Sequence, residues 1–494
     1  MNERLNRYGK WVVLFLLAAV PRILGAFFLP NAFGDAYVYI QEIGTLSTKI
    51  SNGSFRLSDL FGFWLPLYQL IAALLNVFVK NGFYSGKITA ALFGAGTCLL
   101  VYLITMRLTN SPRAALWMFL LIALNPLHIF YSASAMTDIP HAFLVLMALY
   151  FVLTGNWVVA AIFGALAGFT RVESWMLIAL LPFIQFVKER RVSIPALLIL
   201  ILPPLLWFYI SRKATGNWLE CFVQRQQYHD WLLQMNPSIA RFSLVNILKD
   251  SATLLISSDM AILMASLLAG WLVLKRAPQL LKSRVNSDNM GTVVAPVLFF
   301  FAFLALLVIA YLTHQQPIIF PRYGLILFTL GLPILAWTFL WIRSHRPQIA
   351  RTLLIVVVTL CLLDAGIQLA GAVGTVNQYR AQRVVADYLR DHFDQNSGAR
   401  IFCDEGTVRV LSGISEDRFI TSSQAPRDDF AFRSFLGASH VDYLIVADVQ
   451  GSALTKLMRR GEAPSFDGFE ITFHSRTTFL PTDIWLLRTS SAKK

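Results

Sequence analysis

The chain has 494 residues, of which 56% are hydrophobic and only 14% are charged. Soluble globular proteins carry roughly 45–50% apolar and about 25% charged residues, so this composition excludes a soluble enzyme of this size, and equally a disordered chain, a collagen or a coiled coil. The formal net charge of +14 would point to nucleic acid in a soluble protein. In a membrane protein such a surplus collects in cytoplasmic loops.

Apolar segments recur along the first three quarters of the chain. A membrane helix needs about 20 mostly apolar residues, and runs of about this length lie at 11–29, 86–106, 114–131, 256–274, 292–312, 323–342 and 352–370. Shorter runs form close-set hairpins at 139–153, 157–170, 174–187 and 194–210. Together these runs predict a polytopic α-helical membrane protein with about 11 transmembrane helices.

A further apolar run at 64–79 decides the topology. If it lies along the membrane surface, the basic loops around 107–113, 188–191 and 343–351 all fall on one side, as the positive-inside rule requires. If it spans, every later loop changes side. We therefore predict a juxtamembrane helix in the first outer loop, a cytoplasmic N-terminus and a multi-pass location in the plasma (inner) membrane.

The composition changes near residue 377. Residues 399–404, 441–448, 469–475 and 483–488 read as strands, and residues 376–393 read as an amphipathic helix. These patterns predict a transmembrane module over residues 1–376 and a small extracytoplasmic α/β domain over residues 377–494. The tail carries about 15 basic and 15 acidic residues, so the surplus charge belongs to the membrane half. It is an orientation signal, and we expect no nucleic-acid partner.

Two carboxylates stand at the predicted outer boundary. Asp35 follows the first span in GDAYVY, and Asp138 precedes the fourth in TDIPH. Ionisable groups inside a membrane are costly and mark functional sites. Two carboxylates in one cleft can serve as a general base, orient a substrate or bind a divalent metal. Each position equally suits the N-cap of a helix.

Two arginines lie at the same boundary, Arg171 in FTRVESW and Arg322 in FPRYG. A guanidinium binds phosphate in a bidentate manner, which suits a lipid-linked phosphate. The alternatives are snorkelling to lipid headgroups or pairing with a nearby acid. Glu173 is either such a partner of Arg171 or a separate polar contact.

The order of these motifs resembles that of the C-type glycosyltransferases. GDAYVY, FWLPLYQLIAALLNVF, SASAMTDIPHAF, GFTRVESW and PRYG occur in sequence over about residues 10–340. The branch that looks most similar comprises bacterial relatives of protein O-mannosyltransferases and lipid A aminoarabinose transferases. The family's first outer loop usually reads D-E-x-x-Y. Asp35 and Tyr39 match this pattern, whereas Ala36 replaces the second acid and weakens a metal assignment at this loop.

The resemblance implies an inverting transfer of a sugar from a polyprenyl-phosphate donor to a glycan, lipid or protein acceptor on the outer face, by a protein surrounded by membrane lipids. It implies no certain cofactor, with a divalent metal as an open possibility. The residues it marks are Asp35 as catalytic base, Asp138 as second acid, and Tyr39, Arg171, Glu173 and Arg322 as substrate-binding positions.

The alternative is a transporter or flippase for a lipid-linked or small polar substrate. It predicts charged groups near the bilayer midplane and discontinuous helices. Most predicted spans carry few charges in their central stretches, and the candidate residues lie at the outer edge, which favours the enzyme. A sensor, with the tail as its ligand-binding part, ranks third.

Overall fold

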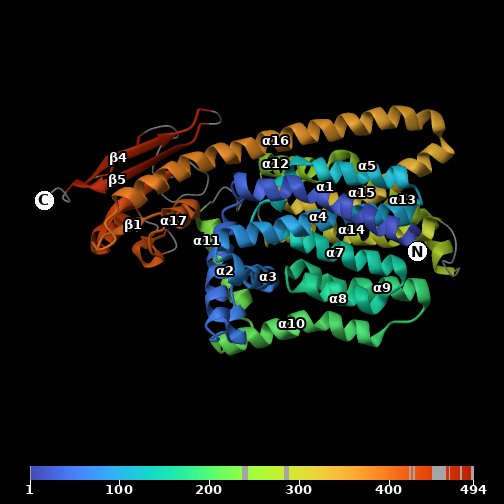
Figure 1. Ribbon diagram of the computed structural model, residues 1–494, viewed down its shortest axis with the longest axis horizontal. Helices are drawn as coiled ribbons and strands as arrows, with labels where there is room; N and C mark the ends of the chain where they lie inside the picture. The colour runs from blue at the N-terminus through green and yellow to red at the C-terminus, as the bar shows by residue number, and fades with distance from the viewer. Residues whose placement is uncertain are drawn as a thin grey trace. The chain divides into compact units, whose positions relative to one another are not determined.

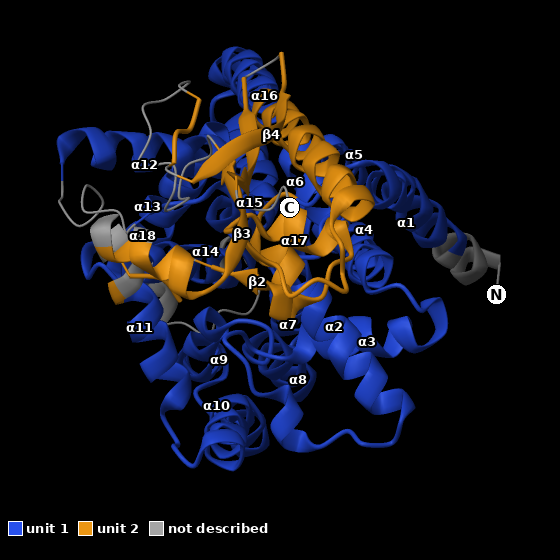
Figure 2. Ribbon diagram, turned by 90° about the vertical axis from the view of Figure 1, so that its left-hand side faces the viewer, with its two compact units in different colours: residues 1–31, 39–229, 238–369 blue, residues 32–38, 230–237, 370–494 orange. Residues whose placement is uncertain are grey.

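The computed structural model describes residues 2–235, 243–282, 289–316, 318–421, 424–426, 429–447, 463–466, 468–478 and 481–490. The chain forms two compact units, coloured separately in Figure 2. The first comprises Met1–Asn31, Tyr39–His229 and Ser238–Leu369; the second comprises Ala32–Val38, Asp230–Pro237 and Ala370–Lys494. The predicted division at residues 376 and 377 falls within one helix and stays a prediction.

The first unit is helical. Its α-helices are α1 (Asn2–Phe28), α2 (Asp35–Ser51), α3 (Leu67–Val79), α4 (Gly82–Thr109), α5 (Pro112–Leu124), α6 (Pro126–Ser132), α7 (Asp138–Thr154), α8 (Trp157–Gly168), α9 (Leu177–Glu189), α10 (Ile194–Thr215), α11 (Glu220–Met235), α12 (Leu244–Ser258), α13 (Met260–Lys282), α14 (Asn289–Leu312), α15 (Gly324–His345) and α16 (Pro347–His392). Three short 3₁₀ helices join them: η1 (Leu57–Leu60), η2 (Val172–Met176) and η3 (Pro321–Tyr323). Helices α2, α11 and α16 each have residues in both units.

Helix α4 lies at the centre of this unit. It contacts α1, α5, α7 and α15, and Figure 1 shows it running between α1 and α7. The apolar core joins buried side chains of these helices with those of α8 and α14. Because apolar side chains of neighbouring helices surround α4 on several sides, its sequence is apolar and has no strong polar face.

The described residues contain six helices long and apolar enough to cross a membrane, or up to eight if each of two bent pairs counts as one span. The pairs α5–α6 and α12–α13 bend by 62° and 87°. Helices α7 and α8 are apolar but shorter than a usual span. The mostly helical membrane protein with a small sheet is thus confirmed, whereas the number of about 11 transmembrane helices is not, because several predicted spans are short or broken.

Helix α3 corresponds to the ambiguous run at 64–79. It has 13 residues, which at 1.5 Å per residue is about 20 Å, less than the roughly 30 Å hydrocarbon core. Its length therefore agrees with the predicted helix along the membrane surface, and the orientation of the chain stays a prediction.

A buried arginine, Arg22, supplies hydrogen bonds at the break between α5 and α6. Pro126 has no N–H and leaves the carbonyl of Ile122 without its helical donor. The Arg22 Nη2 atom donates to that carbonyl at 3.0 Å and lies 2.9 Å from His128 Nδ1. Gly94 of α4 is required beside them, since a Cβ there would lie 2.3 Å from the Ser132 hydroxyl.

Helix α16 satisfies polar groups at both breaks. Asp364 accepts a hydrogen bond from the Met260 N–H at 2.9 Å. Gln368 donates to the Ile256 carbonyl at 2.8 Å and accepts from Asn125 at 2.9 Å. Polar side chains of α16 thus bind backbone groups at the α12–α13 break and the Asn125 side chain at the α5–α6 break.

The second unit holds a five-stranded sheet in the order β2-β1-β3-β5-β4. Its strands are β1 (Arg400–Phe402), β2 (Phe419–Ile420), β3 (Val441–Ala447), β4 (Phe469–Arg476) and β5 (Asp483–Thr489). β1 is parallel to β2 and β3, and β5 is antiparallel to β3 and β4. Helices α17 (Gly406–Ser412) and α18 (Asp429–Ala438), η4 (Glu416–Arg418) and the end of α16 complete the unit.

Each strand predicted from the sequence is present. Residue 448, at the end of one predicted strand, lies outside the described residues. The two-residue strand β2 was not predicted, since so short a segment carries no alternation. The predicted helix at 376–393 is the last part of α16 rather than a separate element.

Candidate active site

Asp138, Arg171 and Glu173 form one ion-paired group. Asp138 is the first residue of α7, where a carboxylate is favoured by the helix dipole. Arg171 immediately precedes η2, and Glu173 lies within it. The guanidinium donates to Asp138 Oδ1 at 2.9 Å and to Glu173 Oε1 at 2.7 Å. The ion pair between Asp138 and Arg171 joins residues 33 positions apart. Of the two roles that the sequence allowed for Glu173, the structure shows the ion-pair partner of Arg171.

The site is largely closed to solvent. The side chains of Asp138 and Arg171 are 5% and 17% exposed. Burial opposes ionisation of Glu173, but the charge of Arg171 and its hydrogen bond outweigh burial and lower the pKa of this carboxyl to about 2. Glu173 is therefore ionised at any physiological pH.

A cavity of about 90 Å³ opens beside this group. Its polar side is formed by Asp138, His141, Arg171, Glu173 and Arg322, and its apolar side by residues of α14 and α15 that include Phe303, Leu306, Leu307 and Ile326. The second carboxylate oxygen of Asp138 is buried and has no hydrogen-bond partner among the described residues. A buried acceptor of this kind is costly unless something donates to it, so Asp138 is suited to hold a hydroxyl of a bound molecule.

Arg322 enters the same cavity from η3. Its guanidinium carbon lies 5.4 Å from the ring centroid of Phe320 and 5.3 Å from that of Tyr323. Arg171 lies 6.0 Å from the same Tyr323 ring. The structure thus brings together four of the predicted residues, Asp138, Arg171, Glu173 and Arg322, with Tyr323 beside both cations.

Tyr39 and Asp35 occupy different surroundings. Tyr39 is 1% exposed, its hydroxyl lies 3.4 Å from that of Thr137, and its ring centroid is 4.7 Å from that of Trp64. Asp35 begins α2, one helical turn before Tyr39. It is not among the residues that line the cavity, and it belongs to the second compact unit, with Ala32–Val38.

Arg225 of α11 is a candidate that the sequence did not single out. Its guanidinium lies 6.0 Å from the Phe63 ring centroid. Burial lowers the pKa of Arg225, and the charge of Glu173 opposes that shift. The polar and aromatic composition of residues 224–231 marked an outer loop, but nothing in it distinguishes this cation from others.

The described residues do not fit a divalent metal. They contain no group of three or more His, Cys, Asp or Glu side chains placed to hold an ion. Arg171 occupies the position of a cation between Asp138 and Glu173. At the first outer loop, Ala36 stands where the family's second acid would be.

Residues 76–187, which include the ion-paired group, match the family of dolichyl-phosphate-mannose-protein mannosyltransferases. The fold is similar to that of ArnT from Cupriavidus metallidurans bound to undecaprenyl phosphate, with a TM-score of 0.55, 12% identity, and coverage of 97% of this chain and 98% of that one. The resemblance to C-type glycosyltransferases is confirmed.

A second enzyme shares this fold. The oligosaccharyltransferase of Archaeoglobus fulgidus, solved with a tethered acceptor peptide, gives a TM-score of 0.53 at 12% identity, over 89% of this chain and 68% of that one. The same organism's AglB in complex with dolichol-phosphate gives 0.51, also at 12% identity, over 90% and 70%. No curated protein matches the sequence. These likenesses establish the C-type fold, and the sugar and acceptor follow from none of them.

Proposed function

We propose that this chain transfers a sugar from a polyprenyl-phosphate donor to a glycan, lipid or protein acceptor at the outer face of the plasma (inner) membrane, with inversion at the anomeric carbon. The observation that carries the proposal is the cavity with Asp138, Arg171, Glu173 and Arg322 on one side and apolar α14 side chains on the other. A sugar phosphate on an isoprenoid tail presents matching polar and apolar parts.

The reaction is a single displacement. Asp35 takes the proton of the acceptor hydroxyl while its oxygen forms a bond to the anomeric carbon from the face opposite the phosphate. The bond from the anomeric carbon to the phosphate oxygen breaks, and its electron pair leaves with the lipid phosphate. General-base assistance of this kind contributes about 10²–10⁴-fold.

The leaving phosphate needs a cation, and two arginines are available. Arg171 is already balanced by two carboxylates, so its guanidinium both positions Asp138 and contributes a partly compensated charge. Arg322 lies on aromatic faces in the same cavity and supplies the larger share of the stabilisation of the phosphate. The remaining Asp138 oxygen accepts a hydrogen bond from a hydroxyl of the donor sugar.

The bent helices are the one observation that favours a transporter or flippase, because discontinuous helices line many transport sites. Their polar groups, however, hydrogen-bond to backbone and side chains of neighbouring helices. Cysteine-accessibility labelling decides between the two functions: a water path open to the cytoplasm would favour transport.

The transferase proposal is tested with Asp35→Asn in membranes supplied with a labelled polyprenyl-phosphate sugar. The variant should lose about 10²-fold or more in turnover. Asp391→Asn is the matched control, since this aspartate is 66% exposed on α16 and should transfer as the unmodified protein does. Turnover by Asp35→Asn at the level of the control would remove Asp35 from the role of base.

A further inference from the structure

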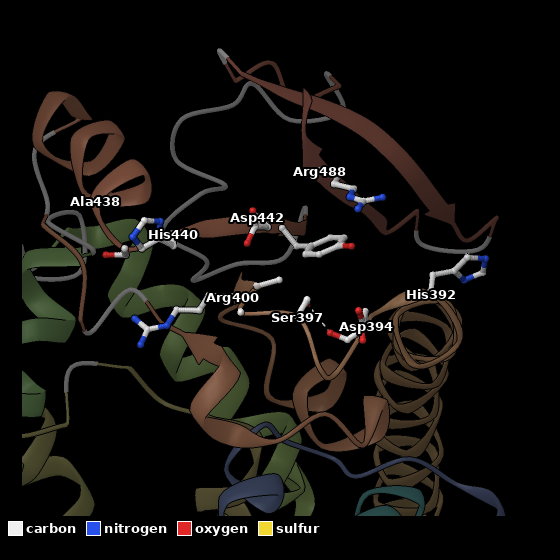
Figure 3. A pocket seen from close by; sticks show the side chains of 12 residues that line it. His392, Asp394, Ser397, Arg400, Ala438, His440, Asp442 and Arg488 are labelled. Carbon is white, nitrogen blue, oxygen red and sulfur yellow. Dashed lines mark hydrogen bonds between the residues drawn. The ribbon is translucent and has the colours of Figure 1, made fainter. Parts of the chain in front are cut away.

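A second, larger cavity lies entirely within the second unit. It has a volume of about 760 Å³ and is lined by residues from the end of α16 through β1, β3 and β5. Figure 3 shows it where β1 and β3 begin. Its volume is within the range of small-molecule sites, roughly 300–1,000 Å³, and none of its lining residues belongs to the candidate active site.

Two arginines line this cavity. Glu470 is the cross-strand neighbour of Arg488 on β4, and the charge of Arg400 helps to lower the pKa of Asp417. Neither Arg400 nor Arg488 forms an ion pair with any residue that the structure describes. Arg488 is paired with Tyr443 across β3 and β5, and its guanidinium lies 5.5 Å from that ring centroid. An arginine stacked on an aromatic face keeps its N–H edge directed outward for a planar anion.

Polar groups also line this cavity. Figure 3 shows Asp442, Ser397 and Asp394 among them, with the guanidinium of Arg400 directed away from that of Arg488. His440 enters from a backbone with φ of 52°, a conformation that a residue other than glycine adopts at a cost. His392 donates its Nδ1–H to the Tyr388 carbonyl at 2.9 Å, so its Nε2 is the ring nitrogen left for a ligand.

These groups match one class of ligand. A phosphate or carboxylate is bound by guanidinium groups, whereas the carboxylate of Asp442 and the Ser397 hydroxyl accept hydrogen bonds from neutral hydroxyls. A simple inorganic anion would fill only a small part of this cavity and would make no use of the Asp442 carboxylate. A saccharide that carries an anionic group satisfies both sets.

We infer that this cavity binds an anionic saccharide, which is the phosphate- or carboxylate-bearing part of the acceptor. The role as acceptor site rests on the proposed function, whereas binding of the saccharide does not. The site would hold the acceptor through its charged substituent and its hydroxyls together.

The test is calorimetric titration of the full chain in detergent with three probes, glucose 1-phosphate, glucuronate and glucose. We expect one or both anionic probes to bind at least about 10-fold more tightly than glucose, since a hydrogen bond to a charged group is worth about that factor or more. Binding should weaken as salt is raised. The preferred anion identifies a phosphosaccharide or a uronate as the source.

Arg488→Gln and Arg400→Gln should each weaken binding of the preferred probe by about 10-fold. Arg383→Gln is the control, because this arginine is 62% exposed on α16 and lies outside the cavity; it should bind the probe unchanged. An unchanged melting temperature of the Arg488 variant excludes a folding defect. Equal binding of glucose and the anions, or full binding by both cavity variants, would overturn the inference.

Transfer activity separates this inference from the proposed function. Sugar transfer by a protein that binds no anionic probe overturns the cavity assignment alone. Probe binding that depends on Arg488, in a protein that transfers no sugar to any acceptor, supports the saccharide site and overturns the transferase proposal together with the acceptor role.

Discussion

Arg171 and Arg488 carry the same charge in opposite settings. Arg171 is buried in the membrane half, and two carboxylates of the protein neutralise it. Arg488 is exposed in the second unit, stacked on Tyr443 and without an ion pair among the described residues. A buried charge must be balanced by the protein, whereas water balances an exposed one. Arg171 is therefore built into the fold, and Arg488 is available to a ligand.

Two carboxyls show the same contrast. Glu173 lies beside Arg171, which lowers its pKa to about 2. Burial and the negative charge of Asp404 raise the pKa of Glu405 to about 7, and the hydrogen bond from Gln382 and the charge of Arg409 only partly oppose the shift. Burial acts alike on both side chains, so the guanidinium that Glu173 contacts directly decides the difference.

The largest expected effect is that of Arg171→Met. The substitution leaves Asp138 and Glu173 without their common cation, and breaking a buried ion pair in this way costs about 3–5 kcal/mol. A thermal melt of the purified protein should show the loss as a marked fall in melting temperature. The double variant Arg171→Met/Glu173→Gln should recover part of it, because one uncompensated carboxylate is removed. A melting temperature equal to that of the unmodified protein would mean that the ion pairs of Arg171 do not stabilise the fold.

An intermediate effect is expected for Glu405→Gln, and it depends on pH. The folded-state pKa of Glu405 is raised, so its stabilising contribution is complete below the unfolded value near 4.5 and declines as pH rises through about 7. Glutamine resembles the protonated form and should therefore melt higher than glutamate at pH 8, by the equivalent of about 1–3 kcal/mol. The two proteins should converge near pH 4.5. Parallel curves across this range would contradict the raised pKa.

The smallest effect on stability is expected for Arg488→Gln. This exposed side chain makes no ion pair with a described residue, and surface changes of this kind usually stay within about 0.5 kcal/mol. Its melting curve should overlay that of the unmodified protein under conditions in which Arg171→Met is clearly destabilised. A large loss would show that the guanidinium is structural and would erase the contrast between the two units.

The sequence predicted much of the fold because its signals are local. The length of the apolar runs predicted the helices, and the alternation of apolar and polar residues predicted the strands of the sheet. The breaks at Asn125 and Asp259 were missed, because the apolar residues on both sides outweigh the short polar segments Asn125-Pro126 and Ser257–Asp259 when hydropathy is averaged over a span. The hydrogen-bond partners that make these breaks tolerable lie far away in the chain: Arg22 and Gln368 donate to free carbonyls, and Asp364 accepts from a free N–H.

The sequence predicted which residues belong to the candidate site, but it did not predict which of them form ion pairs with one another. Asp138, Arg171 and Arg322 stood out because charges are rare beside apolar runs. That Arg171 joins Asp138 as well as Glu173 depends on how α8 packs against both α7 and η2, and no spacing rule expresses it. Arg225 was not singled out, because it lies in a polar segment in which nothing distinguishes it from the residues around it.

Arg22 has a consequence for the order in which the protein is made. The first span carries this guanidinium into the membrane about a hundred residues before the carbonyls of Ile122 and Ala123 are synthesised. An arginine at such a position costs roughly 2.5–3.5 kcal/mol on insertion scales. This cost is offset only when the chain that follows supplies the Ile122 and Ala123 carbonyls, so the first span depends on segments made after it for the pairing of its own charge.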